Sequence, residues 1–280
     1  MANGVAEIEY QEKYIENSRG MKLMTCRWVS GKQEPKALVF MCHGYAMECS
    51  VTMKSAGRRL AEAGFEVYGM DYEGHGKSEG LAGLVSNFND VIQDCSNFFS
   101  SICEKEENKK KMRYLLGESM GGAVALLLHR KKPHFWDGAI LVAPMCKIVD
   151  EMKPSPLVIN MLTALSKIIP TWKLVPTKDI VDLAFKDSEV RKQVSLPFLV
   201  LHGEDDKVTD KSVSIQLHKV ASSKDKTLKL YPGMWHSLLI GEPPENLDTI
   251  YKDIVDWLND KCVHGNTRLE SELKNQNEDK

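Results

Sequence analysis

Residues 117–121 (GESMG) place one serine between two glycines, a spacing that can present a nucleophilic hydroxyl. The apolar run 113–116 (RYLL) comes directly before this motif, and a helical pattern, GGAVALLLHR, follows it. A strand that turns sharply into a helix lifts the residue at the turn above the sheet, and flanking glycines avoid collisions there. The sequence therefore predicts that Ser119 is a nucleophile. The alternative is an ordinary helix N-cap, because serine is a favoured cap.

A serine hydroxyl needs a general base, and that base needs a carboxylate to orient it. In hydrolases built on this strand–turn–helix motif, the order along the chain is serine, acid, histidine. His236 lies in the loop after the last expected strand, 227–231 (TLKLY). We therefore predict that His236 is the base. The alternative is a histidine of a surface loop with no catalytic role.

The acid should follow a strand that precedes this histidine. The run 197–201 (PFLVL) is followed by a loop that holds four carboxylates, Glu204, Asp205, Asp206 and Asp210. Asp210 fits the N-cap of the helix expected next. The spacing alone does not choose between Asp205 and Asp206.

A tetrahedral oxyanion also needs two backbone N–H donors. One comes from the residue after the nucleophile, here Met120, and the other from a loop after an earlier strand. The loop 43–46 (HGYA) follows the apolar run ALVFMC and fits that place, with the Tyr45 N–H as the expected donor. His43 is then expected to be structural rather than catalytic.

These residues need a framework that brings distant loops together. Short apolar runs without alternation are typical of strands covered on both faces, as in a parallel sheet, and helical patterns separate them here. A hairpin around the turn signal 17–20 comes first. The order predicts one doubly wound α/β domain over residues 1–263. Strands are expected at 9–16, 21–29, 37–42, 65–70, 113–116, 138–143, 197–201 and 227–231, and helices at 53–63, 90–105, 121–130, 211–221 and 247–258.

One insertion breaks this rhythm, at about residues 147–195, and it is far longer than an ordinary crossover. It holds two helical patterns, 156–168 and 179–185, and we interpret it as a helical cap over the end of the sheet. Residues 264–280 are polar without apolar periodicity, which predicts a disordered tail. The apolar residues of the cap could line an acyl channel or contact a membrane, although packing on the sheet is the simpler interpretation. They are Leu157, Val158, Ile159, Met161, Leu162, Leu165, Ile168 and Ile169.

Composition excludes several classes of protein. The 280 residues carry 37 Lys and Arg against 39 Asp and Glu, whereas a nucleic-acid binder should show a strongly basic domain or stripe. No run approaches the ~18 to 20 apolar residues of a membrane span, and the first residues lack the pattern of a secretory signal. Seven scattered cysteines without metal-ligand spacing indicate reduced thiols. A cytoplasmic protein is the expectation.

Six motifs in order resemble those of the plant monoacylglycerol lipase-like proteins, a group of α/β-hydrolases that includes caffeoylshikimate esterases and enzymes described as lysophospholipases. The motifs are MCHGYAMECS, DYEGHGKSEG, GESMGGAVALLLH, FWDGAILVAPMCK, LHGEDDKVTD and LYPGMWHSLLIGEP, and the resemblance runs from about residue 9 to residue 258. It implies an α/β-hydrolase fold, with a mostly parallel central sheet, helices on both faces and a helical cap. It further implies a serine esterase or lipase with no metal or organic cofactor.

The resemblance also assigns roles to residues. It places the nucleophile at Ser119, the base at His236 and the oxyanion donors at Tyr45 and Met120. The acid of the family stands three residues after the glycine of the LHG motif, which selects Asp206 over Asp205.

Two features depart from the family pattern. The family usually has glycine where this chain has Ala46, and an alanine costs of order 1 kcal/mol there if the position needs a positive φ. In the cap, residues 187–195 join Phe185 and Lys186 directly to Leu196, where the family has a longer segment with a further helix. The missing helix should leave apolar surface exposed, lower the stability and alter the substrate pocket.

The expected activity is hydrolysis of carboxylic esters of the monoacylglycerol, lysophospholipid or caffeoyl-shikimate type through an acyl-enzyme. An acyltransferase would use the same triad, and the shortened cap leaves an inactive or interaction-only isoform as a further alternative. A dehalogenase or epoxide hydrolase would carry an aspartate at position 119. The expected partner is a lipid or small-molecule ester, with no nucleic acid and with peripheral membrane contact through the cap. The oligomeric state is left open.

Overall fold

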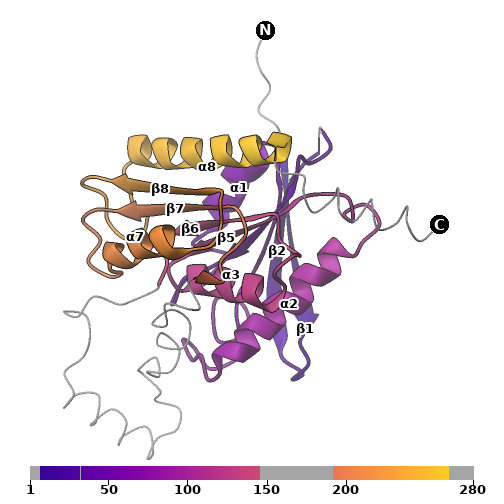
Figure 1. The fold of residues 1–280 in the computed structure, drawn as a ribbon. Coiled ribbons are helices and arrows are strands. Elements are labelled where there is room, and N and C mark those ends of the chain that lie inside the picture. Colours follow the sequence, from indigo (N-terminus) through magenta and orange to yellow (C-terminus); the bar gives the residue numbers. More distant parts are fainter. Residues whose placement is uncertain (1–6, 32, 146–191, 265–280) are drawn as a thin grey trace, which may run out of the picture.

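Eight strands form one sheet in the computed structural model, which describes residues 7–31, 33–145 and 192–264. The strand order is β1-β2-β4-β3-β5-β6-β7-β8 (Figure 1). β1 (Ile8–Glu16) and β2 (Lys22–Ser30) form an antiparallel hairpin, and β2 also pairs antiparallel with β4 (Glu66–Met70). Every later pairing is parallel. The mostly parallel sheet expected from the unalternated apolar runs is therefore confirmed.

The central strands are buried along their whole length, whereas β1 at the edge is largely exposed. In a strand, successive side chains point to opposite faces, so each central strand supplies both sides of the sheet. In β3, for example, Phe40 belongs to one apolar cluster, and Val39 and Met41 belong to the other. The strands of the parallel part, besides β4, are β3 (Leu38–Cys42), β5 (Arg113–Glu118), β6 (Gly138–Val142), β7 (Phe198–Gly203) and β8 (Lys226–Tyr231).

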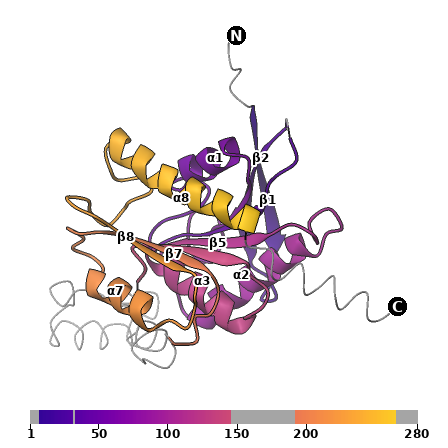
Figure 2. The ribbon, with the colours of Figure 1, turned by 45° about the horizontal axis from the view of Figure 1, so that its top comes forward.

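Helices cover both faces of the sheet (Figure 2). α1 (Lys54–Glu62) and α8 (Pro244–His264) supply side chains to the cluster on one face. α2 (Phe88–Cys103), α3 (Met120–Lys131) and α7 (Lys211–Val220) supply side chains to the cluster on the other face. This three-layer arrangement matches the predicted α/β architecture, and it brings the loops after β3, β5, β7 and β8 to the carboxyl edge of the sheet.

All the strands and helices predicted outside the cap are present, and two of them, β5 and α8, extend beyond their predicted boundaries. β5 was expected to end at 116 but runs through Glu118, because Gly117 and Glu118 continue the parallel ladder with β6. α8 was expected at 247–258 but begins at Pro244 and ends at His264, which the sequence assigned to the tail. Proline is well tolerated in the first helical turn, where its missing N–H has no intrahelical partner.

The predicted cap falls almost wholly on residues 146–191, and the predicted tail on residues 265–280, all of which lie outside the described residues. Lys192 to Ser195 are described and lead into β7. Among the described residues, no helix combines the length and the apolar character that a membrane span requires.

Candidate active site

Ser119 occupies a sharp turn between β5 and α3. Its backbone has φ 55° and ψ −119°, a conformation that a residue with a side chain rarely adopts. The Ser119 N–H donates to Val142 O on the neighbouring strand at 2.9 Å, and the Ser119 carbonyl accepts from the N–H groups of Gly122 and Met145, each at 2.9 Å. Among the described residues its hydroxyl makes no capping hydrogen bond to α3, so the interpretation as an ordinary N-cap fails.

The glycines of the motif are required by close approach of backbone to backbone. A Cβ on Gly121 would lie 1.8 Å from Cys42 O at the end of β3, and one on Gly117 would lie 2.2 Å from Gly121 O. Both distances are far below van der Waals contact. The first turn of α3 therefore packs directly against β3, and this packing brings Ser119 beside the loop that follows β3.

His236 and Asp206 come from the loops after β8 and β7 and are in direct contact. His236 Nδ1 lies 2.8 Å from Asp206 Oδ2. The other carboxylate oxygen, Oδ1, accepts from the N–H groups of Val208 and Thr209 at 2.7 and 3.0 Å, and the Thr209 hydroxyl donates to Oδ2 at 2.8 Å. His202, buried in β7, places its Nε2 3.2 Å from Oδ2. The carboxylate is thus held by several donors besides His236.

These contacts keep the Asp206 carboxyl ionised. Burial alone would raise its pKa, but the hydrogen bonds from His202 and His236 outweigh burial and hold the pKa well below its usual value. An ionised carboxylate accepts a hydrogen bond from His236 Nδ1–H, and this tautomer leaves Nε2 of the imidazole unprotonated and able to accept a proton.

The other carboxylates of this loop lie elsewhere. Asp205 is exposed and uses its backbone N–H to bond Met234 O at 3.0 Å. Asp210 caps α7, as its spacing predicted, with its carboxylate accepting from Ser212 N–H at 2.9 Å. The structure therefore brings Asp206 to His236, the carboxylate that the family resemblance selected and that spacing alone did not.

Within the described residues, no hydrogen bond joins the Ser119 hydroxyl to the His236 imidazole. Catalytic hydrogen bonds in free enzymes are often long and tighten only when substrate binds. Ser119 is buried, with 8 % of its surface exposed, and the His236 side chain is 17 % exposed.

The loop after β3 lies against Ser119. A Cβ on Gly44 would approach Ser119 Cβ to 3.3 Å and Glu118 O to 3.4 Å. The next residue, Tyr45, is 42 % exposed, and its hydroxyl donates to Gly83 O at 3.0 Å. Met120 opens α3, so its N–H has no intrahelical acceptor. The two expected oxyanion donors thus come from segments that flank the serine.

His43 holds the loop after β3 in place through buried contacts. It is fully buried, stacks on Tyr72 with ring centroids 3.7 Å apart, and accepts from Tyr72 N–H through Nε2 at 3.0 Å. Burial lowers the pKa of His43 to about 3, so the ring is neutral and its Nδ1–H donates to Gly44 O at 2.7 Å. This is the structural role expected for His43 from the sequence.

Ala46, the residue at which the family usually has glycine, has φ 55°. This position therefore requires a positive φ, as the glycine of the family suggested, and an alanine in this left-handed region is strained. The strain falls next to Tyr45 in the loop that faces Ser119.

Sequence reasoning missed three residues of this site. Thr209 and His202 hold Asp206, and only the folded turn reveals that role. Glu118 is fully buried directly before Ser119, and its Oε1 accepts from Leu239 N–H at 3.3 Å. The sequence did contain a signal for Glu118, because a carboxylate at the end of an otherwise apolar strand must point into one of the two covered faces.

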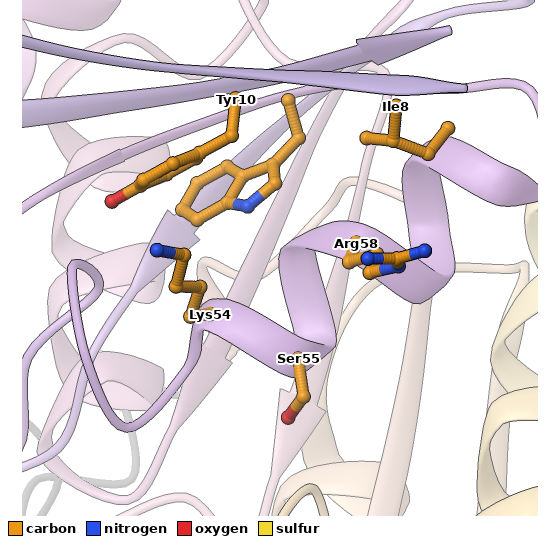
Figure 3. A pocket seen from close by; sticks show the side chains of 6 residues that line it. Ile8, Tyr10, Lys54, Ser55 and Arg58 are labelled. Carbon is orange, nitrogen blue, oxygen red and sulfur yellow. The ribbon is translucent and has the colours of Figure 1, made fainter.

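A separate cavity of about 250 Å³ lies between the β1–β2 hairpin and α1 (Figure 3). Two of the residues that line this cavity are in contact, because Lys54 Nζ lies over the Tyr10 ring, 4.0 Å from its centroid. None of its lining residues belongs to the loops that carry Ser119, Asp206 and His236, so it is distinct from the candidate active site. Within residues 7–31, 33–145 and 192–264, no group of three or more His, Cys, Asp or Glu side chains gathers in a way that could hold a metal ion.

The chain is similar in sequence to a family of hydrolases and to proteins named as esterases and lipases. The family model described as "Serine aminopeptidase, S33" matches residues 33–195 and 189–244. The chain is 31% identical to caffeoylshikimate esterase of Arabidopsis thaliana over 91% of this chain and 86% of that protein. It is 29% identical to monoglyceride lipase of Homo sapiens, over 93% and 94% respectively.

Among solved structures, a soluble variant of monoglyceride lipase from Saccharomyces cerevisiae, in complex with a substrate analog, is similar with a TM-score of 0.73. It is 21% identical, and the match covers 92% of this chain and 96% of that one. This likeness shows the fold.

Proposed function

The chain belongs to the α/β-hydrolase family described as serine aminopeptidase S33. We propose that it hydrolyses carboxylic esters through Ser119, His236 and Asp206. The family description names a peptidase, but the relatives that match nearly the whole chain are named as an esterase and as monoglyceride lipases. We propose an ester of the monoacylglycerol, lysophospholipid or caffeoyl-shikimate type as substrate.

The observation that carries this proposal is the contact between Asp206 and His236. Their 2.8 Å hydrogen bond joins the loops after β7 and β8 at the same edge of the sheet where Ser119 adopts its strained turn. A nucleophile at such a turn, a base and an orienting acid, in this chain order, are the requirements of acyl transfer by a serine hydrolase.

The mechanism has two steps. His236 Nε2 takes the proton of the Ser119 hydroxyl while Oγ attacks the ester carbonyl, and Asp206 stabilises the imidazolium that forms. The N–H groups of Tyr45 and Met120 receive the oxyanion, each donor being worth about 3 kcal/mol of barrier. The imidazolium gives its proton to the departing alcohol, which leaves an acyl-enzyme. Water, deprotonated by His236, then attacks the acyl group, and the acid is released as Ser119 regains its proton.

A fluorophosphonate probe tests this proposal, because it phosphonylates only a serine activated in this way. We expect labelling of the wild type and none of Ser119→Ala, whose thermal midpoint should stay close to that of the wild type. Ser101→Ala is the matched control, since Ser101 is exposed on α2, and it should label like the wild type.

Labelling or turnover by Ser119→Ala would refute the assignment of the nucleophile. A folded wild type that fails to label would favour the inactive isoform. A labelled wild type is next assayed on a monoacylglycerol, a lysophosphatidylcholine and a caffeoyl ester. Product analysis with an added alcohol acceptor separates hydrolysis from acyl transfer.

A further inference from the structure

Glu118 is a buried acid to which the mechanism above assigns no role. It is the last residue of β5, and its side chain lies on the same face of the strand as those of Tyr114 and Leu116, since side chains alternate with a period of two. That face is covered by α1 and α8, and Glu118 is 0 % exposed. Burying a carboxyl among apolar side chains is unfavourable unless it is well paired. Its presence directly before Ser119 therefore calls for an explanation.

The one hydrogen bond that the described structure gives this carboxyl leads to the turn that carries His236. Glu118 Oε1 accepts from Leu239 N–H at 3.3 Å, and Leu239 O accepts from the Tyr251 hydroxyl of α8 at 3.0 Å. Leu239 lies three residues after His236, and the turn is closed by a bond from Leu238 N–H to His236 O at 3.1 Å. Glu118 and Tyr251 thus hold both backbone groups of Leu239, and the base is connected to the strand that carries the nucleophile.

The second oxygen, Glu118 Oε2, is buried without a hydrogen-bond partner among the described residues. A glutamine would keep the acceptor for Leu239 N–H, so the hydrogen bond alone does not require a carboxyl. The property that a glutamine lacks is the ability to carry a negative charge at this place.

In the described structure, the titratable side chains that interact electrostatically with Glu118 are His236 and Tyr251, and Arg59 lies next to Tyr251. The positive charge of His236, on the loop before α8, favours ionisation of the carboxyl and so acts to lower its pKa. Tyr251, on α8, is buried, and its pKa is raised by burial and by Glu118. Arg59 of α1 lies over the Tyr251 ring at 4.9 Å and pairs with Asp248 at 2.8 Å.

We propose that Glu118 is a positioning residue with two effects on His236. It ties the turn that carries the imidazole to the strand that carries Ser119, and its ionised form adds a second buried negative charge that favours the imidazolium. This inference rests on the proposed hydrolase function, because it concerns the base of that reaction.

The second effect should depend on pH. Burial raises the pKa of Glu118 to about 7, although the hydrogen bond from Leu239 and the charge of His236 act in the opposite direction. The carboxyl is therefore mostly protonated near pH 6 and mostly ionised near pH 8.5. A residue with only a packing role would not change the rate in this pattern.

Steady-state kinetics of Glu118→Gln and Glu118→Leu, with p-nitrophenyl butyrate at pH 6 and pH 8.5, test both effects. Glu118→Gln keeps the acceptor but not the charge, so we expect kcat equal to the wild type at pH 6 and on the order of tenfold lower at pH 8.5, with KM unchanged. Glu118→Leu removes the acceptor as well, so kcat should fall at both pH values. Glu106→Gln, at a side chain that is 86 % exposed, is the matched control and should behave like the wild type.

Equal ratios of wild-type to Glu118→Gln kcat at the two pH values would refute the charge effect. Wild-type kcat in Glu118→Leu would refute the positioning effect. Thermal midpoints of the variants identify any that fails to fold.

A readout without turnover separates this inference from the proposed function. In ¹H–¹⁵N spectra, the Leu239 amide should titrate with a midpoint near pH 7 in the wild type and should not do so in Glu118→Gln. An amide that titrates in a protein unreactive to the fluorophosphonate would mean that the hydrolase function fails while the link from Glu118 to the turn stands. An amide that does not titrate in a reactive wild type would overturn the inference alone.

Discussion

Glu118→Gln should make the protein more stable at alkaline pH, and this expectation follows from burial alone. The carboxyl is fully buried, and its pKa rises from 4.5 to about 7 on folding because burial disfavours the charged form. Between these pH values the folded state holds a proton that the unfolded state has released. The free energy of unfolding contributed by this group is thus fully present below pH 4.5 and is lost as the pH rises through 7.

The size of the effect follows from the two pKa values. Each pH unit between them corresponds to about 1.4 kcal/mol, so ionised Glu118 lowers the free energy of unfolding by about 3 kcal/mol above pH 8. Roughly 2 kcal/mol of this develops between pH 5.5 and 8.5. A glutamine cannot ionise, and it keeps the acceptor for Leu239 N–H. The advantage of the variant over the wild type should therefore grow by about 2 kcal/mol over that pH range.

Urea unfolding at pH 5.5 and 8.5, followed by circular dichroism, measures this difference. The informative quantity is the change in the mutational effect with pH, because any packing difference between the two side chains is present at both pH values and cancels. Glu106→Gln, at an exposed site, again serves as the control. If Glu118→Gln changes the free energy of unfolding by the same amount at both pH values, the reasoning is refuted, because the pKa of the carboxyl would then not be raised on folding.

Three further predictions concern the framework of the site. Ala46→Gly should raise the free energy of unfolding slightly, by about 0.5 kcal/mol in urea, because relief of about 1–2 kcal/mol of strain at φ 55° is partly offset by the greater freedom of glycine in the unfolded chain. An alanine at Gly121 would place its Cβ 1.8 Å from the backbone oxygen of Cys42, so Gly121→Ala should lower stability by about 3 kcal/mol or more, and an unchanged thermal midpoint would contradict this. Burial lowers the pKa of His43 to about 3 and that of His129 to about 4, so below pH 6.5 the unfolded state binds a proton at each of these histidines that the folded state does not. These two groups outweigh Glu118, which acts in the opposite direction between pH 7 and 4.5. The free energy of unfolding should therefore fall from pH 6.5 to 4, and a flat profile would contradict this.

The fold was predictable because its signals are local. Each buried strand of the parallel sheet is a continuous apolar run, and the motif at 117–121 could be recognised from the strand before it and the helix after it. The positions of Ser119 and His236 followed from the order of these elements. Boundaries were less predictable, as at β5, where a glycine that reads as a turn continues the ladder with β6.

The acid could not be chosen from the local sequence alone. Asp205 and Asp206 are adjacent and chemically identical, and no periodicity applies in a loop, so only the shape of the turn decides which of them faces His236. That shape depends on Thr209, whose hydroxyl bonds both Asp206 and the carbonyl of Ala143 on another loop. Contacts between residues so far apart in the sequence have no signature in a single sequence.

Backbone strain gives a further reason to place the active site at this edge of the sheet. In the described part of the chain, three residues other than glycine have a left-handed φ: Ala46, Ser119 and Ala143. Ala46 lies in the loop that faces Ser119, and the Ala143 carbonyl accepts from Thr209, which holds Asp206. Such conformations cost of order 1–3 kcal/mol each and persist only where the surrounding structure enforces them. With the buried Glu118 carboxyl beside them, these residues concentrate the unfavourable free energies at one place, as expected where a geometry is kept for chemistry rather than for stability.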